Sequence, residues 1–229
     1  TSNVRKITNQ LTRTISIDTT KEQSKQSNQS FYTTPANTED AYRVWEIIVG
    51  ASIPVADFGS TDINSGGFAK TGFCLGFQYR TQVLKNIQAG LIQVFTYNSV
   101  DESAMEHNFS NQINVTATPW LSFWTMGTIG VLFPISPEGK FHTNGLIGLL
   151  ISGSPKMTAS YQGSFANQLS SISNSFGYGV NIGVTLQRIN VELCYMASKP
   201  KYNITVGSQS FKLEQSISTI QLIVCVAVN

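Results

Sequence analysis

The sequence predicts an all-β fold, an eight-stranded antiparallel up-and-down transmembrane β-barrel preceded by a polar N-terminal extension. Three observations support this prediction. Several stretches alternate between large apolar and small or polar residues, the chain carries few charges, and long and short connections follow one another along it. Alternation with a period of two places the two sets of side chains on opposite faces of a strand.

The clearest alternation covers residues 173–198. From 176 to 187 the large residues share one parity, and a second run follows a tight turn near Arg188 and Ile189. Twelve residues at about 3.4 Å each, tilted by about 45°, cross roughly the thickness of a hydrocarbon core. The face with Gly and Glu192 suits a narrow barrel interior, and the large apolar face suits lipid. We therefore interpret this segment as a membrane-length hairpin with its apolar face outward.

The composition favours the same class of protein. Apolar residues make up 41% of the chain and charged residues only 12%, compared with about 25% charged residues in ordinary globular domains. No apolar run reaches the roughly 18 residues of a transmembrane helix. The net charge of +2 gives no reason to expect a nucleic-acid partner. Cys74, Cys194 and Cys225 are too widely spaced for a metal motif, and alternation places each on the inward face as interior filler.

The other strands are expected along the rest of the chain. The faces of residues 86–98 and 140–153 are ambiguous, and Trp120 and Trp124 have the opposite parity to the other large residues of their strand. That strand therefore needs a bulge or an aromatic interior. The expected strands cover residues 42–54, 67–82, 86–98, 118–134, 140–153, 176–187, 190–198 and 216–229.

The connections between these strands alternate between long and short. Outer-membrane barrels have short periplasmic turns and longer external loops. The pattern therefore places both termini in the periplasm and the long loops outside. An even number of strands also closes an antiparallel meander without an exposed edge.

The first part of the chain, residues 1–41, differs from the rest. It is dominated by Ser, Thr, Asn, Gln and Lys, and such a segment buries too little apolar surface to fold alone. Two interpretations remain open, a flexible periplasmic extension and a tail that docks on a partner. The first residue is Thr1, not Met, which suits a processed N-terminus.

Three segments resemble a known family. They are WEIIVGASIPVADF at 45–58, GFAKTGFCLG at 67–76 and FGYGVNIG at 176–183. They are similar to small outer-membrane β-barrels of Bacteroidetes-type bacteria, relatives of the OmpA/OmpX-like eight-stranded barrels, over about residues 42–229. The resemblance implies a barrel type in the bacterial outer membrane and no particular activity. Such barrels usually end on an aromatic residue, whereas this chain ends Val228-Asn229.

The same resemblance gives a meaning to Asp18-Thr19-Thr20. This tripeptide resembles the short acceptor motif for O-glycosylation in envelope proteins of that group. It makes Thr19 a candidate O-glycosylation site.

Four charged residues, Glu46, Lys70, Arg80 and Glu192, fall on inward faces by alternation. A Lys or Arg facing lipid near the midplane would cost about 2–4 kcal/mol, so the inward assignment is favoured. Their signs balance, which predicts an ion-pair network in the lumen. Eight strands leave an interior just wide enough for side chains, so we expect a structural network and no transport.

Aromatic residues that we expect to face outward lie near several predicted strand ends, as in an interfacial girdle. They are Tyr42, Trp45, Phe68, Tyr79, Phe133, Phe141, Tyr178 and Tyr195.

A catalytic role has little support in the sequence. His107 lies near Asp101, Glu102 and Glu106 in a long loop, which permits an external hydrolytic or divalent-cation site. We favour a solvated acidic loop and expect no catalytic residue, metal or cofactor. A second alternative is a soluble lipocalin-like ligand-binding barrel, which would turn its apolar face inward and its charges outward.

The function that we predict is that of a non-enzymatic structural or accessory subunit of a larger envelope protein complex. Its tail, its loops or its lipid-facing wall would make the contacts. The expected partners are outer-membrane lipid and other outer-membrane or periplasmic proteins.

Overall fold

The computed structural model describes residues 43–108, 112–162, 164–169, 171–206 and 209–228. The predicted extension at 1–41 and the candidate glycosylation site Thr19 lie outside the described residues. The rest of the chain forms a compact unit of its own.

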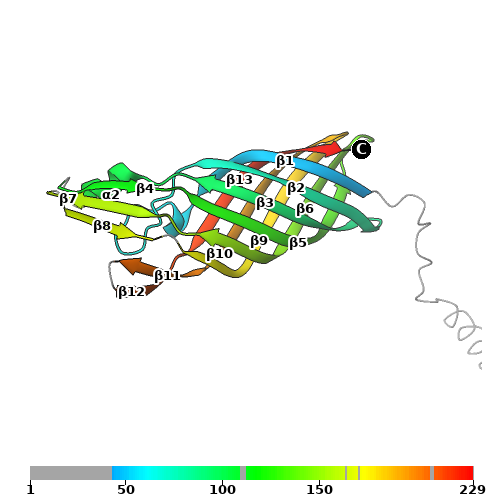
Figure 1. The fold of residues 1–229 in the computed structure, drawn as a ribbon. Helices are drawn as coiled ribbons and strands as arrows, with labels where there is room; N and C mark the ends of the chain where they lie inside the picture. The colour runs from blue at the N-terminus through cyan, green and yellow to red at the C-terminus, as the bar shows by residue number, and fades with distance from the viewer. Residues whose placement is uncertain (1–42, 109–111, 163, 170, 207–208, 229) are drawn as a thin grey trace, which may run out of the picture. The chain divides into compact units, whose positions relative to one another are not determined.

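Eight long strands form a closed antiparallel barrel in which each strand pairs with its neighbours in chain order, and the last strand pairs with the first (Figure 1). The predicted fold class is confirmed. The barrel strands are β1 (Arg43–Pro54), β2 (Gly72–Leu84), β3 (Ile87–Asn98), β5 (Trp120–Pro134), β6 (Gly139–Gly153), β9 (Ile172–Leu186), β10 (Ile189–Ser198) and β13 (Ile217–Val228).

The barrel closes between β1 and β13. Their register runs without interruption from Trp45 opposite Val228 to Pro54 opposite Thr219. Closure leaves no barrel strand with an unpaired edge, which in lipid would expose unsatisfied backbone groups. The strand expected from residue 67 begins instead at Gly72.

The connections alternate as predicted. Three short turns lie at the barrel end where β1 begins and β13 ends (Figure 1). Four long connections lie at the opposite end, which we call the long-loop end. They contain the 3-10 helix η2 (Ala56–Phe58), the α-helix α2 (Glu102–Asn108) and the strands β4 (Asn114–Ala117), β7 (Met157–Tyr161), β8 (Ser164–Gln168), β11 (Lys201–Val206) and β12 (Gln209–Glu214).

The strands of the long connections form a second sheet in the order β12-β11-β8-β7-β4. Its two parts meet only at the pair Val206 and Gln168, since β11 pairs with β8 at no other described position. The sequence predicts irregular loops in this region, so the sheet is a correction. Its strands have four to six residues and lack the long alternation that identifies the barrel strands.

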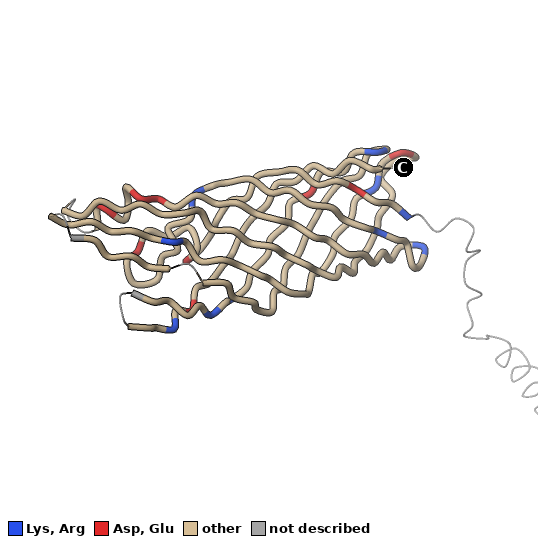
Figure 2. Tube along the Cα trace, viewed as in Figure 1, with Lys and Arg blue, Asp and Glu red and all other residues tan. Residues whose placement is uncertain are grey.

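The charges and the apolar side chains of the barrel are separated. Lys, Arg, Asp and Glu gather toward the two ends, and long stretches of the wall between them carry none (Figure 2). No helix in the described part of the chain is long and apolar enough to cross a membrane.

Candidate functional site

The half of the lumen nearest the short turns is polar. Arg80 Nε donates to Glu46 Oε2 at 2.8 Å, and Arg80 Nη2 donates to Glu46 Oε1. Both side chains are at most 5% exposed. Two parallel charge-assisted hydrogen bonds between a guanidinium and a carboxylate are a strong and geometrically specific contact.

Glu192 lies in the same network. Its carboxylate accepts hydrogen bonds from Gln78 Nε2 at 3.0 Å, from Asn181 Nδ2 at 2.8 Å and from Asn190 Nδ2. His142 Nε2 lies 3.2 Å from Glu192 Oε1. A buried carboxylate is tolerated only when it is paired or well hydrogen-bonded. These neighbours provide the hydrogen bonds that stabilise the buried Glu192 carboxylate.

Gln78 joins the two carboxylates. Its Nε2 atom donates to Glu46 Oε2 at 2.7 Å as well as to Glu192. The network continues across the lumen, because Asn144 donates to Asn181 at 2.7 Å and Gln88 donates to Asn144 at 2.8 Å. Side chains from β1, β2, β3, β6, β9 and β10 therefore meet inside the barrel.

The structure thus brings Glu46, Arg80 and Glu192 together, but it does not place Lys70 with them. Lys70 precedes β2, its side chain is 55% exposed, and its Nζ lies 3.7 Å from Asp101. The inward assignment of Lys70 is wrong because the alternation of residues 67–71 continues past the start of the strand. Of the four charged residues predicted for the lumen, the network therefore contains one Arg and two carboxylates, and amide donors and His142 surround Glu192.

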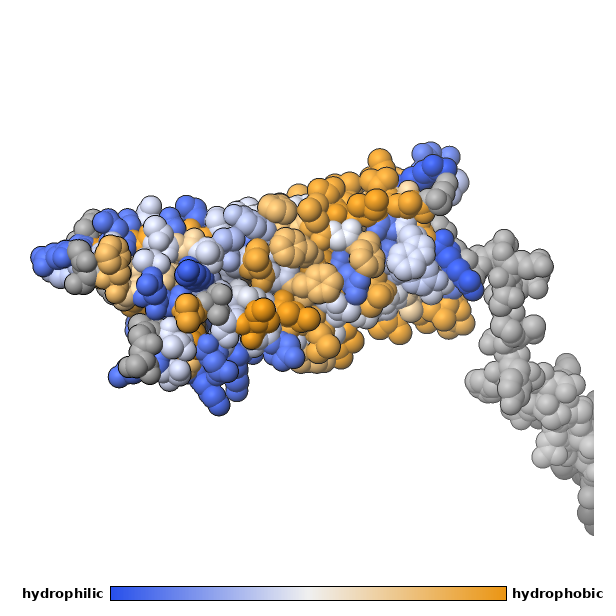
Figure 3. Space-filling view, viewed as in Figure 1, coloured by the Kyte–Doolittle hydropathy of each residue, from blue (hydrophilic) through white to orange (hydrophobic). Residues whose placement is uncertain are grey.

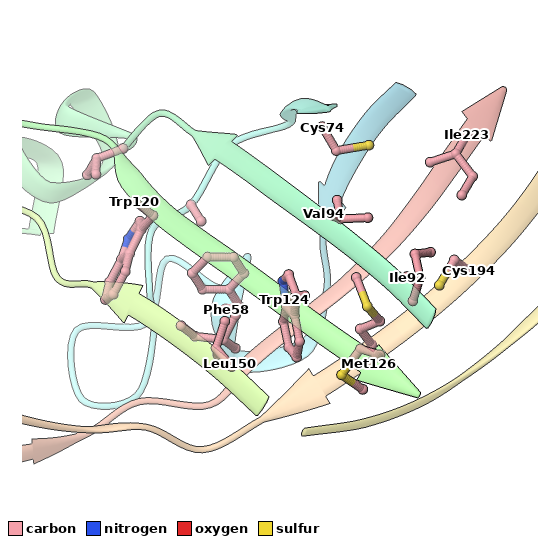
Figure 4. Close-up of a cluster of buried hydrophobic side chains, with 14 of the residues drawn as sticks. Phe58, Cys74, Ile92, Val94, Trp120, Trp124, Met126, Leu150, Cys194 and Ile223 are labelled. Carbon is pink, nitrogen blue, oxygen red and sulfur yellow. The ribbon is translucent and has the colours of Figure 1, made fainter. Parts of the chain in front are cut away.

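Nearer the long-loop end, the lumen contains an apolar cluster, and buried polar residues such as Ser52, Asn98 and Gln221 accompany it. Trp124, Met126, Ile92 and Leu150 are fully buried and converge inside the barrel (Figure 4). The strand that contains Trp124 keeps a regular register with both neighbours. The parity conflict is therefore resolved by an aromatic interior and no bulge. Side chains from several strands therefore occupy this part of the interior.

All three cysteines are free and fully buried, so their inward placement is confirmed. Cys74, Cys194 and Cys225 come from β2, β10 and β13. Gln78 Nε2 lies 3.2 Å from the Cys225 sulfur, which places this thiol at the border of the polar half.

Aromatic rings close the lumen at the long-loop end. The Phe58 ring meets Trp120 edge-on at 5.5 Å, and Trp120 meets Tyr202 edge-on at 5.8 Å. Trp120 Nε1 donates to Gly67 O at 2.9 Å. Burial raises the pKa of the Tyr202 phenol above its usual range, so that ring stays neutral. Residues from the β1–β2 connection, β5 and β11 therefore form one cap.

The outer wall is apolar, as Figure 3 shows for one face. Ile47, Leu149 and Phe176 are each more than half exposed. The wall and lumen thus have the polarity of a membrane barrel. A lipocalin-like barrel needs the opposite faces, so that alternative is wrong. Other outward residues with at least 45% exposure include Trp45, Val49, Leu75, Ile129, Phe133, Ile147, Ile151, Tyr178, Val180, Leu222 and Val226.

Aromatic pairs lie toward both ends of this wall. Trp45 and Tyr79 are 4.8 Å apart between ring centroids near the short-turn end, and Phe73 stacks on Tyr97 at 5.1 Å near the long-loop end. Aromatic residues at two levels are typical of membrane interfaces. Phe68 is a correction, because it is buried in a connection and not on the wall, and Tyr42 lies outside the described residues.

The acidic residues around His107 have structural partners. Asp101 Oδ1 accepts from Ala104 N at 3.1 Å, Glu102 Oε1 from Ala117 N at 2.6 Å and Glu106 Oε1 from Val115 N at 2.9 Å. They start α2 and attach β4 to it. In the described part of the chain no group of three or more His, Cys, Asp or Glu side chains is arranged to hold a metal ion.

No protein-family model and no curated protein sequence matches this chain. Among solved structures, Ail, the attachment invasion locus protein of Yersinia pestis, matches 80% of this chain and 97% of its own, with 20% identity and a TM-score of 0.42. Neisserial surface protein A matches 83% and 100%, with 13% identity and a TM-score of 0.39.

A backbone structure of Ail in a phospholipid bilayer nanodisc matches 82% of this chain and 100% of its own, with 12% identity and a TM-score of 0.37. Likeness at this level carries no argument about function. The barrel assignment rests on the strand pairing of this chain itself.

Proposed function

We propose that the chain is a non-enzymatic β-barrel of a bacterial outer membrane and an accessory subunit of a larger envelope protein complex. The observation that supports membrane residence is the reversed polarity of the barrel. Ile47 and Leu149 are each 58% exposed on the wall, whereas Glu46 is 2% and Glu192 1% exposed inside. Soluble proteins rarely expose contiguous apolar patches beyond a few hundred Å².

The energetics favour lipid around this wall. Full burial of one large apolar side chain is worth about 1.5–3 kcal/mol, and outward apolar residues occur on all eight barrel strands. In water the same wall would drive aggregation. In hydrocarbon its cost disappears, and the closed ladder leaves no backbone edge to satisfy.

The unequal connections support one orientation in the membrane. Outer-membrane barrels have short turns on the periplasmic side and long loops outside. With the four long connections at one barrel end, the second sheet and α2 face the exterior, and both chain termini belong to the periplasm. A Bacteroidetes-type envelope, with O-glycosylation at Thr19, is the form of this proposal that the sequence resemblance suggests.

The surfaces that remain available support the proposed role as a subunit. In the described part of the chain, the polar network and the cluster around Trp124 occupy the lumen. The surfaces left for interaction are the external sheet, the wall and residues 1–41. Of these, the polar tail is the part that we propose to engage a periplasmic partner.

Mild detergent extraction of native membranes, followed by identification of co-purifying proteins, tests both parts of the proposal. We expect the protein in the detergent-soluble membrane fraction with defined partners. Deletion of residues 1–40 should leave the barrel folded and remove those partners, whereas Lys212→Gln on exposed β12 should retain them. Recovery of the protein without detergent would overturn membrane residence, and partners retained after the deletion would overturn the tail as the docking element.

A further inference from the structure

A groove of about 480 Å³ lies on the outer surface of the barrel at the long-loop end. Its apolar lining comes from outward residues of three neighbouring strands, namely Phe95 of β3, Leu121 and Phe123 of β5, and Ile151 of β6. The adjoining connections supply Thr118, Pro119, Ser154 and Ser171. Sites that enclose a small ligand usually have about 300–1,000 Å³, so the groove is large enough to hold one.

A smaller polar pocket adjoins the groove. Its volume is about 330 Å³, it shares Ile151 and Ile172 with the groove, and it adds Ser173, Asn174 and Lys201. The Lys201 backbone N–H donates to Ser173 Oγ at 3.1 Å, which fixes the start of β11 beside the pocket. An apolar groove next to a polar pocket that a lysine lines matches an amphiphile with a negative head.

We propose that the groove and the pocket together bind one membrane lipid with an anionic phosphate headgroup. The acyl chain would occupy the groove, and the phosphate would lie at Lys201. This inference rests on the proposed membrane residence. The groove is continuous with the lipid-facing wall through Phe123 and Ile151, and it ends where the external polar segments begin, which is the level at which headgroups replace hydrocarbon.

Gly153 keeps the groove open. A Cβ atom at Gly153 would meet no atom within 4 Å, although Gly153 lines the groove. By contrast, a Cβ atom at Gly148 would lie 2.1 Å from Thr125 O, so that glycine is required by strand packing. A large side chain at position 153 would therefore enter the groove without a clash with the barrel.

The ion pair beside the pocket is weak enough to be exchanged. Lys201 Nζ lies 3.2 Å from Glu214 Oε2, and the two side chains are 71% and 51% exposed. Pairs this exposed contribute little to stability. A phosphate can therefore replace the Glu214 carboxylate as the partner of Lys201, and Glu214 competes with it.

Native mass spectrometry of the full-length protein in detergent micelles tests the proposal. The probes are dioleoyl-phosphatidylglycerol and dioleoyl-phosphatidylcholine, which have the same chains and differ in net charge. We expect the wild-type protein to retain one phosphatidylglycerol in preference to phosphatidylcholine. Gly153→Leu should weaken retention of both lipids by about tenfold or more. The matched control Gly145→Leu lies on the same strand and the same face, where a Cβ atom meets only Ile129 O at 3.9 Å, and should retain lipid normally.

Two charge variants test the headgroup contact in opposite directions. Lys201→Gln should reduce the preference for phosphatidylglycerol toward parity, and Glu214→Gln should increase it. The proposal is overturned if Gly153→Leu binds lipid as the wild type does, or if neither charge variant changes the preference. Flotation with phosphatidylcholine vesicles distinguishes a failure of lipid binding in the groove from a failure of the proposed membrane residence. If the wild-type protein floats but retains no lipid, only this inference fails, whereas a protein that does not float contradicts the proposed function.

Discussion

The guanidinium of Arg80 holds the carboxylate of Glu46 through two hydrogen bonds inside the barrel, and neither side chain is more than 5% exposed. Removing one partner of a buried pair leaves an uncompensated charge, which typically costs about 3–5 kcal/mol. Replacing both partners by apolar residues of similar volume is often neutral. The position of the pair therefore allows its two contributions, charge compensation and packing, to be measured separately.

Arg80→Met should lower the free energy of unfolding by about 3–5 kcal/mol, and the double variant Glu46→Leu/Arg80→Met should regain a large part of that loss. Urea unfolding in lipid bilayers, followed by Trp fluorescence, measures both values. The control is Lys70→Met, because the Lys70 pair with Asp101 is exposed and such pairs contribute about 0–1 kcal/mol. A double variant as unstable as Arg80→Met would show that compensation of Glu46 is not the main contribution.

Gly177 on β9 faces the Trp124 ring. A Cβ atom at this position would lie 2.9 Å from Trp124 Cζ3, and Trp124 is fully buried. Gly177→Ala should therefore destabilise the barrel by about 1–3 kcal/mol, the usual cost of overpacking a core, and change the near-UV circular dichroism of the Trp. Gly145→Ala is the control, since its Cβ atom would make only an ordinary contact with Ile129 O at 3.9 Å. Equal stability of the two variants would argue against tight packing at Trp124.

The sequence predicts the barrel because period-two alternation over ten to fifteen residues has no other simple explanation. The same rule misplaces Lys70. Residues 67–71 imitate the alternation, but they lie in a connection where Ala69 makes only an isolated bridge to Val100. Parity indicates a face only within a paired strand, and the sequence does not show where the pairing begins.

The residues that complete the lumen network are harder to predict. Gln78 and His142 have inward parity, but polar residues are common and nothing local indicates which carboxylate they meet. The face of residues 140–153 is ambiguous because Leu146 and Leu150 share the inward side with His142 and Asn144. The separation of a charged network near the short turns from an apolar cluster around Trp124 becomes visible only when the eight strands are aligned.

A charge on the wall tests whether the barrel is embedded in lipid. Ile147 lies in the middle of β6 and is 59% exposed, and Phe211 lies on β12 of the external sheet and is 53% exposed. In a bilayer, Ile147→Lys should cost about 2–4 kcal/mol near the midplane, whereas Phe211→Lys should have little effect. Folding into phosphatidylcholine vesicles at graded urea concentrations measures the difference. Similar behaviour of the two variants would mean that the wall does not contact hydrocarbon.

The helix α2 provides a test of the external loop. Glu102 Oε1 accepts a hydrogen bond from Ala117 N at 2.6 Å and so ties β4 to the helix. Glu102→Ala leaves that N–H without its partner, which typically costs about 1–3 kcal/mol when the group is buried. Faster hydrogen exchange at the Ala117 amide, with an unchanged barrel, is the expected result. His107→Ala should change the free energy of opening at the Ala117 amide and the free energy of unfolding of the barrel by no more than about 0.5 kcal/mol each, as for most surface substitutions. An external catalytic or cation site predicts instead that His107→Ala loses activity or divalent-cation binding. That result would contradict a purely structural role for this acidic segment.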